Sequence, residues 1–212
     1  MAEHITHEIT PIPPAELAAA LLAAWHYLFG EMPDRRVLLV LIAQSAHETG
    51  EWKHVHNFNI GNVKGGDGDG YDYTNFRCRE KDKNGNDVYF DPPHPATRFR
   101  AFRTLLEGCV DLLRFLRGRK RYAAAWQALQ TGDPVAFAKA LKLGGYYTDP
   151  VEVYARGLRA YYAKYDREVP RELEPPPLDD ETKRRTMERV ALSLDELGDK
   201  VVARPSKPPP IA

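Results

Sequence analysis

The chain has 212 residues, of which 43% are hydrophobic and 28% are charged. These values are close to the averages of globular domains, so the length suits one substantial domain with a tail and neither a disordered chain nor a membrane protein is expected. Thirty Lys and Arg residues balance thirty Asp and Glu residues, which removes the electrostatic argument for a dedicated nucleic-acid binder.

The apolar stretches of the chain are short. The longest, residues 17–25 and 37–43, fall well below the ~20 residues that span a bilayer, so no membrane insertion is expected. The first Lys or Arg is Arg35, which follows the first apolar stretch, and we therefore predict no Sec-type export signal. Cys78 and Cys109 are expected to be reduced thiols rather than a disulfide.

Two helices are predicted near the start of the chain. Pro13 and Pro14 open a run of apolar residues at helical spacing that ends at Gly30. A second helix is predicted over residues 35–49, since Val37, Leu41, Gln44 and Glu48 step by four, three and four along one helical face. Gly50 is expected to end this second helix.

A long loop and a small β region follow. Residues 51–70 are rich in Gly, Asn, Asp and His without periodicity, which is typical of a functional loop. Residues 71–80 and 87–90 are aromatic and β-prone, and Asn84-Gly85 between them predicts a hairpin. Prolines interrupt the chain before a predicted short strand over residues 97–102.

The rest of the core is predicted to be helical. Helices are expected over residues 105–117, 122–129, 134–143 and 150–165. Beyond residue 166 the chain contains a triple proline, a charged segment with helical potential over residues 179–200 and a Pro-rich end over residues 204–212. We therefore expect a mainly α catalytic domain with a small β-hairpin lobe at residues 1–165, and a Pro-rich linker, short helix and tail at 166–212.

Glu48 is the residue whose position suggests chemistry. It continues the apolar face of the second helix at its carboxyl end, where burial and the negative end of the helix dipole both favour the protonated acid. General-acid cleavage of a glycosidic bond requires a carboxylic acid that keeps its proton near neutral pH. The alternative is a Glu that ends a helix with its carboxylate in water.

Four motifs occur in a fixed order along the chain. They are Ala43-Gln-Ser-Ala-His-Glu-Thr-Gly50, Asn57-Phe-Asn-Ile-Gly-Asn-Val-Lys64, Phe99-Arg-Ala-Phe-Arg103 and Gly145-Tyr-Tyr-Thr-Asp-Pro150. Together, over about residues 34–165, they resemble the peptidoglycan glucosaminidases of glycoside hydrolase family 73, which include autolysins, flagellar rod-associated hydrolases and phage lytic enzymes. The resemblance implies a lysozyme-like, mainly helical fold with a small β-lobe.

The resemblance also implies roles for individual residues. In that family the Glu before Ser/Thr-Gly in the first of these motifs is the catalytic acid, and the match here is Ala46-His-Glu-Thr-Gly50, which implies that role for Glu48. Glu80 stands where a second acidic residue of the β-lobe is usual, which makes it the candidate base. Its rivals are Asp67, Asp69 and Asp72, together with assistance from the substrate. Tyr146 matches a tyrosine that lines the cleft and orients substrate or stabilises charge, with a packed core tyrosine as the alternative.

Other residues in and beside the matched motifs are expected to contact substrate. They are Gln44, Trp52, Phe58, Asn59, Asn62, Lys64 and Tyr147. The rings of Trp52, Phe58, Tyr71, Tyr73 and Tyr89 either stack on sugars or pack the lobe. Glu51 stands before Trp52 where the family's Trp directly follows Gly, and Gly61-Asn62 replaces its Phe-Gly, so details of the cleft are expected to differ.

No metal and no cofactor are expected. His47-Glu48-Thr-Gly-Glu51 lacks the second His of the zinc pattern. The two segments that resemble calcium loops begin at Asp67 and Asp82, and at the twelfth position they carry Cys78 and Pro93 instead of Glu.

The expected function is hydrolysis of the β-1,4 bond after N-acetylglucosamine in peptidoglycan, with Glu48 as the general acid. Lytic transglycosylase or muramidase action is one alternative, and a non-catalytic wall-binding component of a phage tail or secretion apparatus is another. The expected partner is the glycan strand, with the C-terminal tail as the candidate contact for a phage or secretion partner. The protein is expected to be made in the cytoplasm and to act at the wall or periplasm after release, injection or virion assembly. Residues after Asp166 are predicted to be dispensable for hydrolysis.

Overall fold

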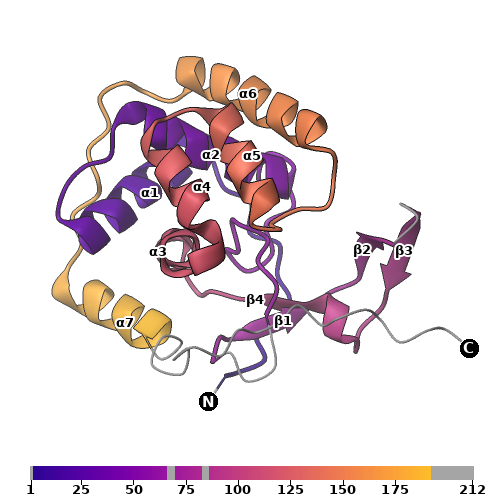
Figure 1. The fold of residues 1–212 in the computed structure, drawn as a ribbon. Helices are drawn as coiled ribbons and strands as arrows, with labels where there is room; N and C mark the ends of the chain where they lie inside the picture. The colour runs from indigo at the N-terminus through magenta and orange to yellow at the C-terminus, as the bar shows by residue number, and fades with distance from the viewer. Residues whose placement is uncertain (1, 66–69, 83–85, 192–212) are drawn as a thin grey trace, which may run out of the picture.

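The structure is a computed structural model that describes residues 2–65, 70–82 and 86–191 (Figure 1). Its helices are α1 (Pro14–Phe29), α2 (Arg35–Thr49), α3 (Leu105–Gly118), α4 (Ala123–Gln130), α5 (Pro134–Leu143), α6 (Val151–Glu168) and α7 (Asp180–Ala191). Its strands are β1 (Tyr73–Asn75), β2 (Cys78–Lys81), β3 (Asp87–Phe90) and β4 (Arg98–Arg100), and the short 3₁₀ helices are η1 (Pro95–Thr97) and η2 (Lys120–Tyr122). The predicted mainly α fold with a small β-lobe is confirmed.

Helix α2 is the central element of the helical body. The Asp34 side chain caps its first turn by accepting a hydrogen bond from the Arg36 amide at 2.8 Å, and Gly50 ends it in the left-handed conformation at φ 58°. Its residues from Val37 to Ala46 are all buried. Helices α1, α4, α5 and α6 pack around it. The last turn of α2 lies beside the first turn of α6. The predicted bounds of this helix, 35–49, are confirmed.

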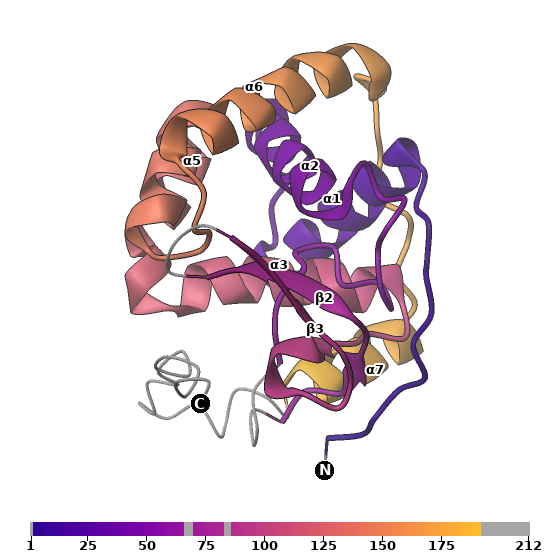
Figure 2. The ribbon, with the colours of Figure 1, turned by 90° about the vertical axis from the view of Figure 1, so that its right-hand side faces the viewer.

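The β-lobe differs in one respect from its prediction. The hairpin is present, with β2 and β3 paired antiparallel from Cys78 opposite Phe90 to Lys81 opposite Asp87. The run 71–80 is however two strands, since β1 pairs with β4 instead, with Tyr73 opposite Arg100. The hairpin projects from the helical body in Figure 1 and lies in front of it in Figure 2.

The strand predicted over residues 97–102 is shorter than expected. Pro95 takes the first position of η1, and the His94 side chain caps this turn by accepting from the Ala96 amide at 3.0 Å. Thr97 therefore ends a helical turn, and only Arg98–Arg100 form β4.

The helical body continues beyond the predicted boundary at residue 165. Helix α6 ends at Glu168, and the Arg35 guanidinium donates to the backbone oxygens of Asp166, Val169 and Pro170. Val169 is 3% exposed within the core, so the chain up to this residue is part of the same packed unit.

Helix α7 lies within the segment predicted to be helical. It packs against α3, and the Tyr27 hydroxyl donates to the Lys183 carbonyl at 3.2 Å. Helices α6 and α7 lie on opposite sides of the other helices in both views (Figure 1 and Figure 2). The Pro-rich end at 204–212 is outside the described residues. Among the helices described, none has the length and apolar character needed to cross a membrane.

Candidate active site

Glu48 lies in the last turn of α2, against the first turn of α6. The Tyr154 hydroxyl donates a hydrogen bond to Glu48 Oε1 at 2.6 Å. Tyr154 is 2% exposed, whereas Glu48 is only partly buried. One carboxyl oxygen is thus fixed by the protein while the side chain keeps some contact with the surface.

The surroundings of Glu48 favour its protonated form. Burial raises the pKa of this carboxyl to about 7, the hydrogen bond from Tyr154 opposes that rise, and the negative charge of Asp149 adds to it. A pKa of about 7 means that protonated and ionised forms are both well populated near neutral pH. Glu48 is therefore able to deliver a proton at that pH.

Aromatic rings hold Tyr154 in place. The Tyr147 ring stacks on the Tyr154 ring, with centroids 3.7 Å apart and planes within 5°. His47 meets the Tyr154 ring edge-on at 4.5 Å. A side chain at Gly157 would have its Cβ 2.7 Å from the His47 ring, so glycine is what allows α6 to approach α2 here. These contacts leave Tyr154 little freedom to turn away from Glu48.

Sequence reasoning missed Tyr154. Its spacing from Ala155 and Leu158 marks only a buried helical face, and all three are in fact buried. The one available signal was its position, one turn after the Asp149-Pro150 helix start that closes the tyrosine motif.

Tyr146 is held by a short chain of hydrogen bonds. Gln44 Nε2 donates to the Tyr146 hydroxyl at 2.7 Å, and that hydroxyl donates to the Gly61 carbonyl at 2.8 Å. Gln44 is completely buried. Burial and the charge of Glu48 both hold the pKa of Tyr146 well above its usual value, so the phenol stays neutral. In this structure Gln44 positions Tyr146 and presents no surface to a ligand.

Glu80 lies on β2 of the hairpin, away from the buried helix end that carries Glu48. Lys64 Nζ is 2.5 Å from Glu80 Oε1. The Glu80 side chain is 44% exposed. Lys64 also donates to the Ala96 carbonyl and lies 4.5 Å from the centroid of the Phe99 ring. Lys64 thus links the Glu80 carboxylate on β2 to Ala96 and Phe99 in the rest of the lobe.

The rival acids are placed differently. Asp72 Oδ1 accepts from the Glu3 amide at 2.9 Å, and its other oxygen is 3.9 Å from Arg103, so it ties the N-terminal segment to the lobe. Asp67 and Asp69 are outside the described residues.

Besides Gln44, two more residues predicted to bind substrate are buried and have structural contacts instead. Trp52 is 2% exposed, packs on Tyr165 and donates from Nε1 to Ser45 Oγ at 3.0 Å. Asn59 is 3% exposed, and its amide binds the backbone of Val63 and Arg100. Neither side chain offers a surface to a sugar in this structure, because both are buried and hydrogen-bonded to other parts of the protein.

The remaining predicted contacts keep some accessible surface. Phe58 is half-buried and Asn62 is exposed, both with positive φ in the loop after α2. Tyr147 is also half-buried. Of the rings suggested for stacking, Tyr71 is buried beneath the Arg100 guanidinium, while Tyr89 is 55% exposed.

No set of three or more His, Cys, Asp or Glu side chains is placed to hold a metal ion within the residues that the structure describes. Cys78 and Cys109 are free thiols.

A known family model matches most of the chain. The family model described as mannosyl-glycoprotein endo-beta-N-acetylglucosaminidase matches residues 37–167, a range that contains Glu48, Glu80 and Tyr146. No curated protein matches the chain. The resemblance drawn from the four motifs is confirmed.

Solved structures with a similar fold are known. The chain is similar to a peptidoglycan hydrolase mutant from Sphingomonas sp. A1, with 24% identity, 83% of this chain and 94% of that chain covered and a TM-score of 0.50. It is also similar to a C-terminally truncated glycoside hydrolase domain from Salmonella typhimurium FlgJ, with 23% identity, 73% and 99% covered and a TM-score of 0.48. It is similar as well to the catalytic domain of the autolysin Auto from Listeria monocytogenes, with 19% identity, 71% of this chain and 80% of that chain covered and a TM-score of 0.49.

Proposed function

The chain belongs to the mannosyl-glycoprotein endo-beta-N-acetylglucosaminidase family and is a glycoside hydrolase, and on that premise we propose that it cleaves the β-1,4 bond after N-acetylglucosamine in peptidoglycan. The wall polymer is proposed because the four motifs are those of wall glucosaminidases and because the Sphingomonas protein of similar fold is itself described as a peptidoglycan hydrolase.

One observation supports the proposal most strongly. Glu48 is a carboxyl with a pKa of about 7 that accepts a hydrogen bond from a buried tyrosine. In the proposed reaction Glu48 donates its proton to the leaving glycosidic oxygen as the bond to the sugar carbon breaks. Tyr154 holds the carboxyl in one orientation before the proton is transferred and stabilises the carboxylate afterwards.

The second role is proposed for Glu80. A water molecule attacks the sugar carbon as Glu80 takes a proton from it; in the substrate-assisted alternative, the acetamido oxygen attacks that carbon first and water then opens the ring so formed. Glu80 stands on a separate lobe from Glu48, so we expect the two carboxyls to be separated by at least the ~6.5–9.5 Å that leaves room for water rather than the ~5–5.5 Å of a retaining pair. Lys64 would hold the Glu80 carboxylate in position for that task.

Digestion of purified sacculi with product analysis by mass spectrometry tests the function. The proposal requires products with reducing-end N-acetylglucosamine. Reducing-end muramic acid would indicate a muramidase, and anhydro-muramic acid would indicate a lytic transglycosylase. Sedimentation of the protein with sacculi without any sugar release would indicate a wall-binding component, and each of these three outcomes would overturn the proposal.

A further inference from the structure

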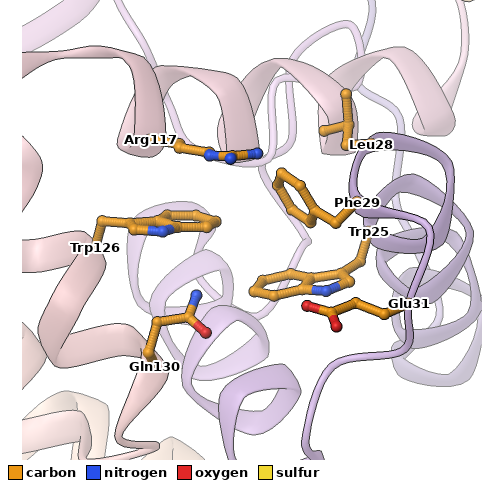
Figure 3. Close-up of a pocket in the computed structure, with 7 residues that line it drawn as sticks. All are labelled: Trp25, Leu28, Phe29, Glu31, Arg117, Trp126 and Gln130. Carbon is orange, nitrogen blue, oxygen red and sulfur yellow. The ribbon is translucent and has the colours of Figure 1, made fainter.

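A pocket lies between α1, α3 and α4, far from Glu48. Its volume is about 360 Å³, within the range of small-ligand sites. The residues that line it are Trp25, Leu28, Phe29, Glu31, Arg117, Trp126 and Gln130 (Figure 3). Glu31 lies in the loop four residues before α2 begins at Arg35, whereas Glu48 is in the last turn of α2. At ~1.5 Å per residue, the helix separates the two sites by roughly 20 Å.

The pocket has an aromatic platform. The indole rings of Trp25 and Trp126 lie nearly parallel, with centroids 5.5 Å apart and planes within 14°. Phe29 meets both rings edge-on, and the Arg117 guanidinium lies 4.7 Å from the Phe29 centroid. Figure 3 shows the two indoles as neighbouring parallel planes. Trp25 is 4% exposed and supports the half-buried Trp126 by stacking, so the Trp126 ring is the one that can meet the flat C–H face of a pyranose ring.

The pocket also has a hydrogen-bond donor without an acceptor. Trp25 is 4% exposed, and its buried Nε1 has no hydrogen-bond partner among the described residues. A buried donor left unpaired is unfavourable, and tryptophan N–H groups normally find a partner when buried. In Figure 3 the nitrogen lies on the edge of the ring toward Glu31. An oxygen of a bound ligand would supply the missing acceptor.

The other polar groups narrow the class of ligand. Glu31 supplies acceptors, Arg117 supplies donors, and the Gln130 amide supplies both. Glu31 and Arg117 carry opposite charges, so the pocket favours a ligand without strong net charge, and its polar groups favour one that forms hydrogen bonds. An N-acetylhexosamine has one flat apolar face, hydroxyls that donate and accept, and an amide that does both. Its chemistry matches that of the pocket.

We propose that this pocket binds an N-acetylhexosamine unit of the glycan strand as an anchoring site separate from the catalytic one. This inference rests on the proposed function, because the ligand is a unit of the proposed substrate. A strand held at both sites would raise the local concentration of glycosidic bonds near Glu48. The anchor would raise the rate of cleavage of the polymeric wall, whereas an oligosaccharide too short to reach both sites could bind it without being cleaved faster.

The first test is a titration of the Glu48→Gln protein with chitotriose, a soluble trimer of N-acetylglucosamine, followed by the NMR signals of the indole N–H groups. The chain has three Trp residues, each assigned with a Trp→Phe variant. We expect a downfield shift for Trp25 as its N–H gains an acceptor. Trp52 is the internal reference, since its N–H already donates to Ser45. Saturating binding that leaves the signals of Trp25 and Trp126 unmoved would overturn the proposal.

The second test measures cosedimentation of the Glu48→Gln protein with sacculi after further substitution. Trp126→Ala removes half of the platform, and Glu31→Gln changes an exposed residue whose replacement leaves the core intact. Loss of one aromatic contact predicts binding about two- to tenfold weaker. Glu16→Gln, an exposed position at the other end of α1, is the matched control and should leave binding unchanged. If the Glu31→Gln and Trp126→Ala substitutions both leave binding as tight as in the Glu48→Gln protein without them, the anchor is contradicted.

The two proposals fail in different ways. If the chain does not cleave sacculi but chitotriose still shifts Trp25, the anchor stands and the proposed hydrolysis fails. If the chain cleaves sacculi with the expected products and the Trp126→Ala protein, with Glu48 intact, cleaves them at the parent rate, the hydrolysis stands and the anchor fails.

Discussion

The helical body and the β-lobe each contribute one candidate acid, in opposite surroundings. Glu48 sits at a buried helix end beside a neutral tyrosine, and burial raises its pKa to about 7. Glu80 sits on an exposed hairpin with its carboxylate beside Lys64. The first environment suits a group that must give up a proton near neutral pH, and the second suits a group that must stay in position beside water. Two residues of one chemical type are thus separated in role by their surroundings alone.

Replacing Glu48 with Gln breaks the comparison at its main point. Gln keeps the size and the hydrogen bond from Tyr154 but has no transferable proton, so turnover on sacculi should fall by roughly 10²–10⁴-fold. Circular dichroism should show an unchanged fold. A folded Glu48→Gln protein as active as the parent would remove Glu48 from the mechanism.

The same substitution should change how stability depends on pH. The pKa of Glu48 is about 7 in the folded state and near 4.5 in the unfolded chain, so the folded state holds a proton that the unfolded state releases. Stability from this group is therefore complete below about pH 4.5 and is lost as the pH rises to about 7. Since one pKa unit corresponds to about 1.4 kcal/mol, the loss is up to about 3 kcal/mol.

Urea denaturation at pH 5 and pH 8 measures this effect. From pH 5 to pH 8 the parent should lose stability relative to the Glu48→Gln protein, because Gln cannot ionise. Parallel pH dependence of the two proteins would show that Glu48 titrates normally.

Glu80→Gln sharpens the comparison from the side of the lobe. The acetamido group of the substrate can attack the sugar carbon in place of water. We therefore expect turnover to fall by about tenfold, less than for Glu48→Gln. An exposed ion pair contributes only about 0–1 kcal/mol, so neither Glu80→Gln nor Lys64→Met should change the unfolding midpoint much. Unchanged turnover in the Glu80→Gln protein would remove Glu80 from the mechanism.

Tyr154→Phe tests the positioning of Glu48, with the smallest expected effect. Loss of the hydroxyl removes the hydrogen bond that lowers the pKa of Glu48, so the alkaline limb of the pH–rate profile should move up by about one unit. Turnover near pH 6 should fall only several-fold. Tyr165→Phe is the control, because this buried hydroxyl on the same helix donates to Glu51 at 3.2 Å. A limb that stays in place in Tyr154→Phe would make Tyr154 a packing residue only.

Most of the helices could be predicted from the sequence because their signals are local. Apolar spacing, Asp34 before α2 and glycines after α1 and α2 mark these ends within a residue or two. The pairing of β1 with β4 could not be predicted, since it joins segments separated by the hairpin and depends on tertiary contacts. The extension of α6 to Glu168 was missed for the same reason, because Arg35 at the start of α2 holds its end.

The candidate site could be predicted only in part. The position of Glu48 could be inferred from its place on an apolar helical face, and the family motifs located Tyr146. Motifs do not show which way a side chain points, and the structure turns Trp52 and Asn59 inward. Tyr154 carries the closest contact to Glu48, yet its spacing is that of an ordinary core residue.

Helix α7 has a practical consequence for engineering. It packs on α3, and Figure 1 shows it on the opposite side of the helical body from α6, whose first turn carries the Tyr154 that contacts Glu48. A fusion partner or surface linker attached after Ala191 would therefore leave from the far side of the molecule. An enzyme immobilised through that end would keep Glu48 turned toward the solution, whereas a linker at the loop before α6 would obstruct it.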